Sequence, residues 1–136
     1  MTPPARNAHL RNCVVIIDDE PNIRETVAFI LEAEGVEVAT AADGISGLAV
    51  VRRVRPKVIL VDVMMPRMDG YEVCRAVRQD PNLLGTYLII LTAKGQKSDE
   101  TRALEMGADL YLSKPFDDEV VLNVIRQVFD GLPVTL

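Results

Sequence analysis

The sequence is poor in the residues that build redox and transition-metal centres. It has two cysteines and one histidine among 136 residues. Neither Cys13 nor Cys74 has a cysteine or histidine partner at the spacing of a metal site, so we expect both to be small core residues. His9 lies in the N-terminal segment 1–11, which we expect to be a flexible leader. The cysteines and the histidine therefore do not suggest a site of chemistry.

Long apolar runs are also lacking. No run approaches the roughly 18 apolar residues of a membrane-spanning helix. The N-terminal sequence MTPPARNAHLRN has no apolar core of a signal peptide. We therefore expect a cytoplasmic protein without a membrane partner.

Positive charge is the minority sign. The formal net charge of −5 argues against direct binding of DNA or of an anionic membrane surface. We expect the longest basic cluster to be a solvated helix end, where cations suit the helix dipole; it consists of Arg52, Arg53, Arg55 and Lys57.

The hydrophobic content of 49% is enough for one core. We place a single domain at residues 12–130, followed by a tail at 131–136.

Five short apolar runs alternate with five helical patterns. The predicted strands are Cys13 to Ile17, Val36 to Thr40, Val58 to Val61, Tyr87 to Leu91 and Leu110 to Leu112. The helices are expected to begin at Pro21, Asp43, Asp69, Ser98 and Asp117, with Gly35 and Gly107 ending the first and the fourth. This alternation predicts an α/β fold with a doubly wound parallel sheet of five strands and five helices.

Functional residue types stand at the ends of four of these strands. Asp62 ends VILVD and is followed by the turn-forming sequence VMMPRMDG, Asp18 and Asp19 follow VVII, Thr92 follows LIIL, and Lys114 follows LYLS. Any one of these is usually a solvated turn residue. Together, and in this order, they resemble the receiver domain of two-component response regulators over residues 12–130. The resemblance implies the strand order 2-1-3-4-5 and a signalling switch rather than an enzyme.

In such a sheet the ends of the first and third strands face a crevice where ligands bind. Asp18, Asp19 and Asp62 should meet there, although more than forty residues separate the pair from Asp62. Three carboxylates repel one another unless a cation neutralises them, and oxygen ligands suit Mg²⁺. A solvated acidic rim is the plainer alternative.

The resemblance assigns a role to each site residue. Asp62 would accept a phosphoryl group from a histidine kinase or a phosphotransfer protein. Asp19, Asp62 and the Met64 carbonyl would bind the metal, with Asp18 acting directly or through water. Lys114 and Thr92 would then contact the phosphoryl oxygens. The Met64 side chain and Lys94 would border the path of attacking water and slow the loss of phosphate.

The resemblance also implies a switch. Tyr111 would turn inward after Thr92 moves, and the Lys114-Pro115 bond would be cis, although sequence alone favours trans. The fourth helix, fifth strand and fifth helix would bind a downstream protein or a second copy. Apolar Val120 and Val124 in DDEVVLNVIRQVF indicate either a docking face or a wide core stripe.

Other functions fit less well. A haloacid dehalogenase-type phosphatase needs an aspartate where this chain has Met64. A flavodoxin-like carrier needs hydroxyls and glycine where DDEPN stands, and a Rossmann enzyme needs G-x-G-x-x-G at the same turn. A receiver cut from a larger regulator, with an output domain after Leu136, remains an open alternative.

Overall fold

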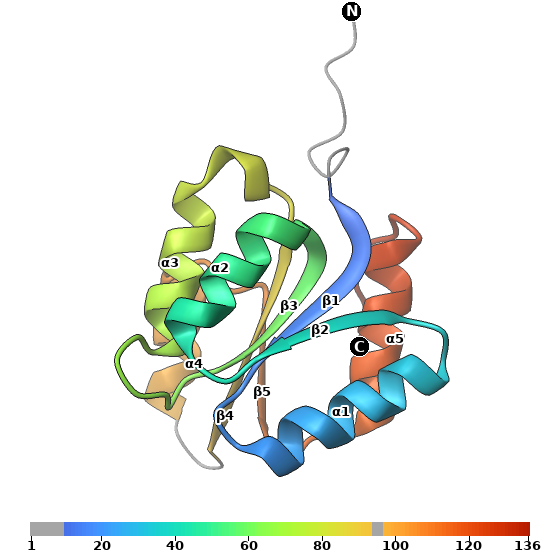
Figure 1. Ribbon diagram of the computed structural model, residues 1–136, viewed down its shortest axis with the longest axis horizontal. Coiled ribbons are helices and arrows are strands. Elements are labelled where there is room, and N and C mark those ends of the chain that lie inside the picture. Colours follow the sequence, from blue (N-terminus) through green and yellow to red (C-terminus); the bar gives the residue numbers. More distant parts are fainter. Residues whose placement is uncertain (1–9, 94–96) are drawn as a thin grey trace, which may run out of the picture.

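The computed structural model describes residues 10–93 and 97–136, without the side chains of 93–99, and within these residues it forms a five-stranded parallel sheet (Figure 1). The strands are β1 (Arg11–Ile17), β2 (Glu37–Ala41), β3 (Pro56–Asp62), β4 (Tyr87–Ala93) and β5 (Leu110–Lys114). Their order is β2-β1-β3-β4-β5, and all four pairings are parallel. The predicted fold class and strand order are confirmed.

The helices begin close to the predicted positions. They are α1 (Pro21–Ala33), α2 (Gly44–Val54), α3 (Gly70–Gln79), α4 (Lys97–Glu105) and α5 (Asp118–Phe129), with a short 3₁₀ helix at Pro81–Leu83. Asp43, Asp69 and Asp117 stand one residue before α2, α3 and α5, where each carboxylate accepts a hydrogen bond from the first helical turn. Gly35 and Gly107 follow α1 and α4 with positive φ angles, as expected for residues that end helices.

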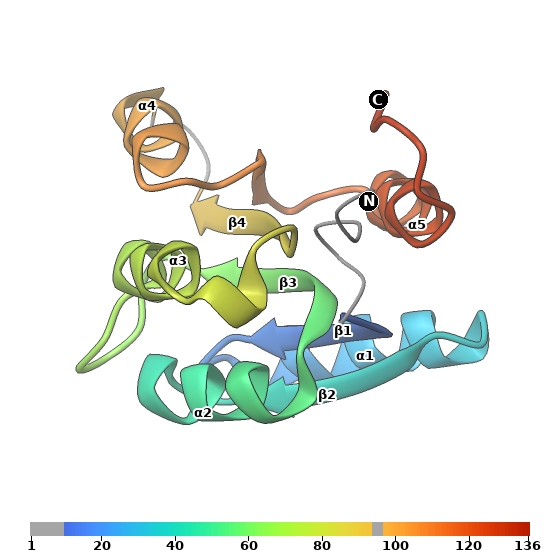
Figure 2. The same ribbon diagram turned by 90° about the horizontal axis from the view of Figure 1, so that it is seen from above.

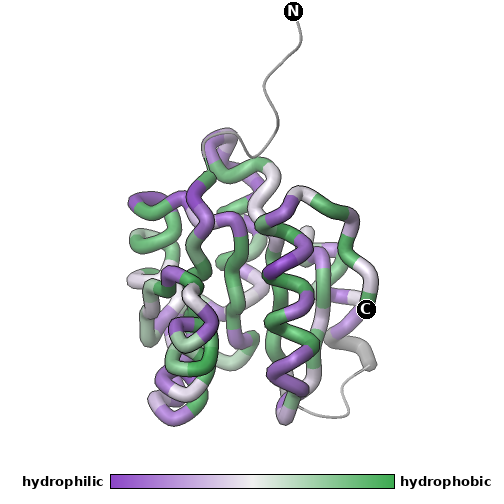
Figure 3. The backbone as a smooth tube through the Cα atoms, turned by 90° about the vertical axis from the view of Figure 1, so that its right-hand side faces the viewer, coloured by the Kyte–Doolittle hydropathy of each residue, from purple (hydrophilic) through white to green (hydrophobic). Residues whose placement is uncertain are grey.

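The helices form one layer on each face of the sheet (Figure 2). One hydrophobic cluster joins α2, α3 and α4 to the sheet, and the other joins α1 and α5 to its opposite face. Along the helices, hydrophobic and hydrophilic stretches alternate, so each helix has one face for the core (Figure 3). Cys13 on β1 and Cys74 on α3 are both buried, as predicted. The central strands are thereby covered on both faces, and their carboxyl ends meet at one edge.

Helix α5 has a wide core stripe. Val121, Leu122, Val124 and Ile125 are all buried, and Val120 is half-buried. Because Val124 belongs to the core and Val120 is half-buried, the structure supports the wide core stripe, one of the two alternatives that the sequence left open. The apolar excess of α5 contributes to packing.

After α5 the chain reverses at Gly131 and runs back along the helix. The side-chain amide of Gln127 binds the main chain of Thr135 on both sides: its Nε2 donates to the Thr135 carbonyl at 3.0 Å, and its Oε1 accepts from the Thr135 N–H at 2.8 Å. Val134 packs against the core. The tail thus follows α5.

None of the described helices is long and apolar enough to cross a membrane.

Candidate functional site

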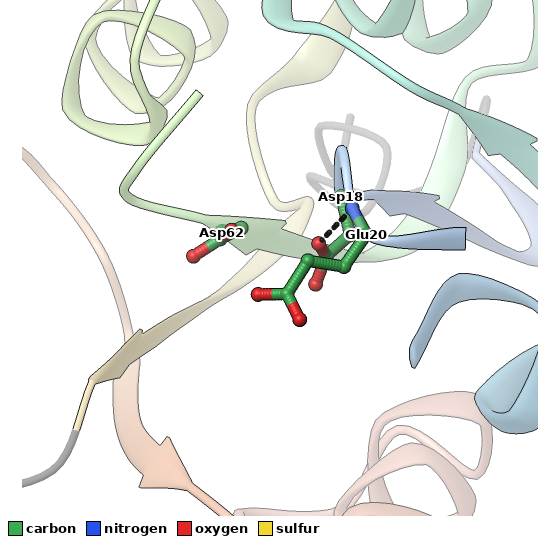
Figure 4. Close-up of side chains that lie close together, drawn as sticks. All are labelled: Asp18, Glu20 and Asp62. Atoms are coloured by element: carbon green, nitrogen blue, oxygen red, sulfur yellow. Dashed lines mark hydrogen bonds between the residues drawn. The ribbon is translucent and has the colours of Figure 1, made fainter. Parts of the chain in front are cut away.

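The site lies where β1 and β3, neighbours at the centre of the sheet, reach their carboxyl ends. Ile17 pairs with Val61, so Asp18 and Asp62 leave adjacent strands side by side. Both are buried, with 0% and 4% of their surface exposed. Figure 4 shows these two side chains close to that of Glu20. Two aspartates that are distant in the sequence therefore share one crevice, as predicted.

Asp18 is held at all of its polar groups. Its N–H donates to the Ala41 carbonyl at 3.1 Å, and its carbonyl accepts from Arg24 Nη1 at 2.7 Å. One carboxylate oxygen accepts from the Glu20 N–H at 2.9 Å, and the other from Lys114 Nζ at 2.9 Å. A buried carboxylate needs such partners. Asp18 is therefore a fixed part of the site.

The environment of Asp62 disfavours the charged form of its carboxyl group. Burial, followed by the negative charge of Asp18, raises its pKa to about 6. Lys114 Nζ at 3.4 Å and the Met64 N–H at 3.4 Å act in the opposite direction. The carboxyl group is thus desolvated but still ionised in large part at neutral pH.

The turn after β3 fixes the main chain of Asp62. The Gly70 N–H donates to the Val63 carbonyl at 3.1 Å. A Cβ atom on Gly70 would lie 2.4 Å from the Asp62 carbonyl oxygen, closer than any packed side chain tolerates. Arg67 adopts a positive φ of 70° within this turn. The segment MMPRMDG therefore folds back tightly against the main chain of Asp62 and Val63.

Lys114 reaches the crevice from the end of β5. Its Nζ lies 2.9 Å from Asp18 Oδ2, 3.4 Å from Asp62 Oδ2 and 3.5 Å from Glu20 Oε1. Burial lowers the pKa of this ammonium, but the surrounding carboxylates outweigh burial and raise it. The Lys114-Pro115 bond is cis, as the resemblance implies. Among the described residues, Lys114 is thus the cation that pairs with all three carboxylates of the crevice.

The acidic residues that come closest differ from the expected set. Asp18, Glu20 and Asp62 each offer an oxygen within 4.8 Å of the others. Asp19 is exposed and lies outside this group, although it lines the same open pocket. Sequence reasoning missed Glu20, whose signal was the third acid of the DDE run. Hard oxygen donors converging at such distances fit Mg²⁺.

The remaining predicted residues lie around this centre. Thr92 is buried near the end of β4, paired in register with Ser113 of β5. Tyr111 lies on β5, half-buried against the α2–α3–α4 core cluster. The Met64 side chain is 73% exposed and lines the pocket with Asp62. Lys94 lies outside the described residues, as does His9.

The pocket beside Asp62 is open and has a volume of about 750 Å³. Its acidic end adjoins Asp62 and Lys114, and its apolar end lies between α1 and the start of α5. The apolar residues at that end include Ile23, Val27, Pro115 and Phe116. A protein carrying a reactive group could therefore approach Asp62 from this side.

Comparison with known proteins identifies the family. A profile of the response regulator receiver domain matches residues 14–126. The chain therefore belongs to the response regulator receiver domain family. Receiver domains are signalling switches that bind Mg²⁺ at an acidic pocket and interact with histidine kinases and with output domains.

Individual relatives differ in length. The chain is 41% identical over 113 residues to the DNA-binding dual master transcriptional regulator RpaA of Synechocystis, covering 83% of this chain and 47% of RpaA. It is 38% identical over 113 residues to Protein PilG of Pseudomonas aeruginosa, covering 83% of this chain and 84% of PilG. The chain thus spans about half of RpaA but most of PilG.

Solved structures agree with the fold. The chemotaxis protein CheY4 of Vibrio cholerae has a TM-score of 0.79 and 36% identity, covering 85% of this chain and 97% of CheY4. A response regulator from Chloroflexus aurantiacus has a TM-score of 0.82 and 31% identity, covering 88% of this chain and 98% of that protein.

Proposed function

We propose that the chain is a phosphorylation switch in which Asp62 accepts a phosphoryl group from a phosphohistidine of a histidine kinase or a phosphotransfer protein. A carboxylate oxygen of Asp62 forms the new P–O bond. The P–N bond to the donor imidazole breaks, and its electron pair stays with the imidazole. The observation that carries this proposal is the burial of Asp62 at a strand end, with the Lys114 ammonium 3.4 Å away.

Mg²⁺ is the cofactor that fits the acidic crevice. Asp18, Asp19, Asp62 and the Met64 carbonyl are the proposed ligands, and Glu20 stands close enough to bind directly or through water. When bound, Mg²⁺ would offset negative charge on the transferring oxygens. Asp18 would hold its position for this task through its hydrogen bonds with Ala41, Arg24 and the Glu20 N–H.

After transfer, Lys114 and Thr92 would contact the phosphoryl oxygens. Lys114 must leave part of its present ion pairing with Asp18 to do so, which links the modification to β5. Tyr111 lies on the same strand, before Lys114. We propose that the movement of Thr92 and Tyr111, together with that of Lys114 and Pro115, alters the surface of α4, β5 and α5, where a downstream protein or a second copy binds.

The phosphorylated state should persist. Met64 is exposed at the rim of the pocket and offers attacking water no acid or amide. Met64→Asn is expected to shorten the lifetime of the acyl phosphate, by about tenfold if the barrier falls by about 1.4 kcal/mol. An unchanged decay of isotopically labelled phosphate would remove Met64 from this role.

A second candidate is a receiver that forms one part of a larger regulator. The observation that favours it is the match to only 47% of RpaA, since RpaA is a DNA-binding regulator about twice as long as the matched segment. The match to 84% of PilG favours a receiver that acts on a separate protein. The reading frame after Leu136 distinguishes the two.

The test is phosphorylation by a small donor. Acetyl phosphate with Mg²⁺ is expected to label the chain, and excess EDTA to abolish labelling while circular dichroism stays unchanged. Thr92→Ala is expected to be labelled but to show reduced NMR shifts at Tyr111 and in α5. Labelling that survives chelation would contradict the role of the metal.

A further inference from the structure

The side chain of Arg24 binds a main-chain carbonyl of the acidic loop between β1 and α1. Arg24 Nη1 donates to the carbonyl oxygen of Asp18 at 2.7 Å. The Arg24 N–H donates to the Glu20 carbonyl at 3.1 Å and so belongs to the first turn of α1. Among the described residues Arg24 forms no ion pair, whereas Lys114 pairs with three carboxylates. The two cations near the crevice therefore act on different groups.

The loop needs this bond because α1 lacks the usual cap. The carboxylates of Asp43, Asp69 and Asp117 cap α2, α3 and α5. Glu20 occupies the same position before α1 but makes no side-chain cap bond, and Pro21 follows it. A side-chain cap normally fixes the entry of the chain into a helix. For α1, the Arg24 side chain supplies a tie from the helix back to the loop.

Loss of the Arg24 side chain would change the positions of the Asp18 and Glu20 carboxylates. With Arg24 removed, the buried carbonyl of Asp18 loses its partner, at a cost that a small shift of the main chain can reduce. The Glu20 N–H, which binds Asp18 Oδ1 at 2.9 Å, would move with the loop. Asp18 and Glu20 would then lose their present alignment with Asp62.

We propose that Arg24 is a positioning residue for the magnesium site: it orients the carboxylates of Asp18 and Glu20 by holding the main chain between β1 and α1. This inference rests on the proposed function. Mg²⁺ demands near-ideal octahedral geometry, so small displacements of its ligands lower its affinity. Arg24 thus favours binding of a cation even though it is itself a cation.

The positive charge of Arg24 determines the direction of the change in Mg²⁺ affinity that each explanation predicts. If Arg24 acted only through its charge, replacing it with a neutral residue would strengthen Mg²⁺ binding, because a repelling charge is removed. If Arg24 positions the loop, the same replacement weakens Mg²⁺ binding. The two explanations predict opposite changes in one dissociation constant.

The experiment titrates the purified chain with Mg²⁺ by calorimetry. Arg24→Met is expected to raise the dissociation constant roughly tenfold, as is usual for residues that orient metal ligands. Arg24→Lys keeps a donor and should recover most of the affinity. Arg53→Met is the matched control, because Arg53 is an exposed arginine in the last turn of α2, at the opposite end of the helix from the site. Binding by Arg24→Met as tight as wild type, or tighter, would overturn the proposal.

A metal-free measurement separates this proposal from the function on which it rests. Amide hydrogen exchange of Glu20 in EDTA is expected to be several-fold faster in Arg24→Met than in wild type or Arg53→Met, by the loss of about 1 kcal/mol of hydrogen bonding. Arg24→Gln serves as a second variant if Arg24→Met does not fold. Unchanged exchange of Glu20 would overturn the positioning role, whereas wild-type protein that failed to bind Mg²⁺ would overturn the proposed magnesium site.

Discussion

Lys114 and Asp18 form an ion pair across the crevice, 2.9 Å from Nζ to Oδ2, and the carboxylate in this pair has no exposed surface. The two residues are 96 positions apart in the sequence. Lys114 occupies the space among the carboxylates that a bound metal ion would share. At the proposed magnesium site the ammonium and Mg²⁺ would therefore compete for the same oxygens.

This competition predicts the behaviour of Lys114→Ala. Removing the ammonium takes a positive charge away from three carboxylates, so Mg²⁺ should bind several-fold more tightly, by about 1 kcal/mol. Phosphorylation should persist, but the conformational response should be poor, because no cation remains to join the phosphoryl group to β5. Calorimetric titration and NMR shifts of α5 after phosphorylation measure the two effects. Weaker binding of Mg²⁺ by Lys114→Ala would contradict this account of the crevice.

The raised pKa of Asp62 predicts how stability depends on pH without metal. The pKa is about 6 in the folded chain, and an unfolded aspartate titrates near pH 4. Between these values the folded chain binds more protons, so its free energy of unfolding falls as the pH rises from about 4 to about 6.

Asp62→Asn removes this titration. In EDTA at pH 7.5 the variant should be more stable than wild type by about 3 kcal/mol, and the difference should shrink toward pH 4. Urea unfolding at several pH values measures it. A difference that does not change with pH would mean that the Asp62 carboxyl is not desolvated as the structure shows.

Asp19 and Glu20 can be compared directly as metal ligands. The family resemblance assigns the ligand to Asp19, but the structure places an oxygen of Glu20, and none of Asp19, beside Asp18 and Asp62. We expect Asp19→Asn to lose roughly tenfold or more in Mg²⁺ affinity and to lose phosphorylation. Glu20→Gln should lose about threefold, the effect of removing one charge that acts on the metal through water. The reverse order of losses would make Glu20 the ligand.

The sequence was informative where function depends on strand ends. The positions of Asp62, Thr92 and Lys114 at strand ends could be predicted because each follows an apolar run, whereas the order of the strands in the sheet came from the family resemblance. The helix starts at Asp43, Asp69 and Asp117 were equally visible, since capping is a local interaction.

Contacts between distant side chains were not predictable in the same way. The bonds from Lys114 to Asp18 and from Arg24 to a main-chain carbonyl depend on how the loops close, and no local pattern encodes them. The sequence could not decide between a docking face and a wide core stripe at Val120 and Val124 for a related reason. Helical periodicity shows that α5 is apolar on a broad face, but only the position of α1 and the sheet shows how much of that face is covered.

Two glycines test the turn that fixes Asp62. A Cβ on Gly70 would lie 2.4 Å from the Asp62 carbonyl oxygen, whereas one on Gly35 would meet nothing within 4 Å. Gly70→Ala should therefore destabilise the chain by about 3 kcal/mol and reduce labelling of Asp62. Gly35→Ala should cost only about 1 kcal/mol, for the positive φ angle of 83°, and leave labelling intact. Urea unfolding of the matched pair checks this, and equal losses would show that the contact at Gly70 is not close.

The most direct test of the central claim is the chemical location of the phosphoryl group. The chain is treated with acetyl phosphate and Mg²⁺, the acyl phosphate is trapped by borohydride reduction, and the modified residue is mapped by mass spectrometry. We predict modification at Asp62 alone, no modification of Asp18 or Asp19, and no labelling of Asp62→Ala. Modification at another residue, or full labelling of Asp62→Ala, would contradict the assignment of Asp62 as the phosphoacceptor.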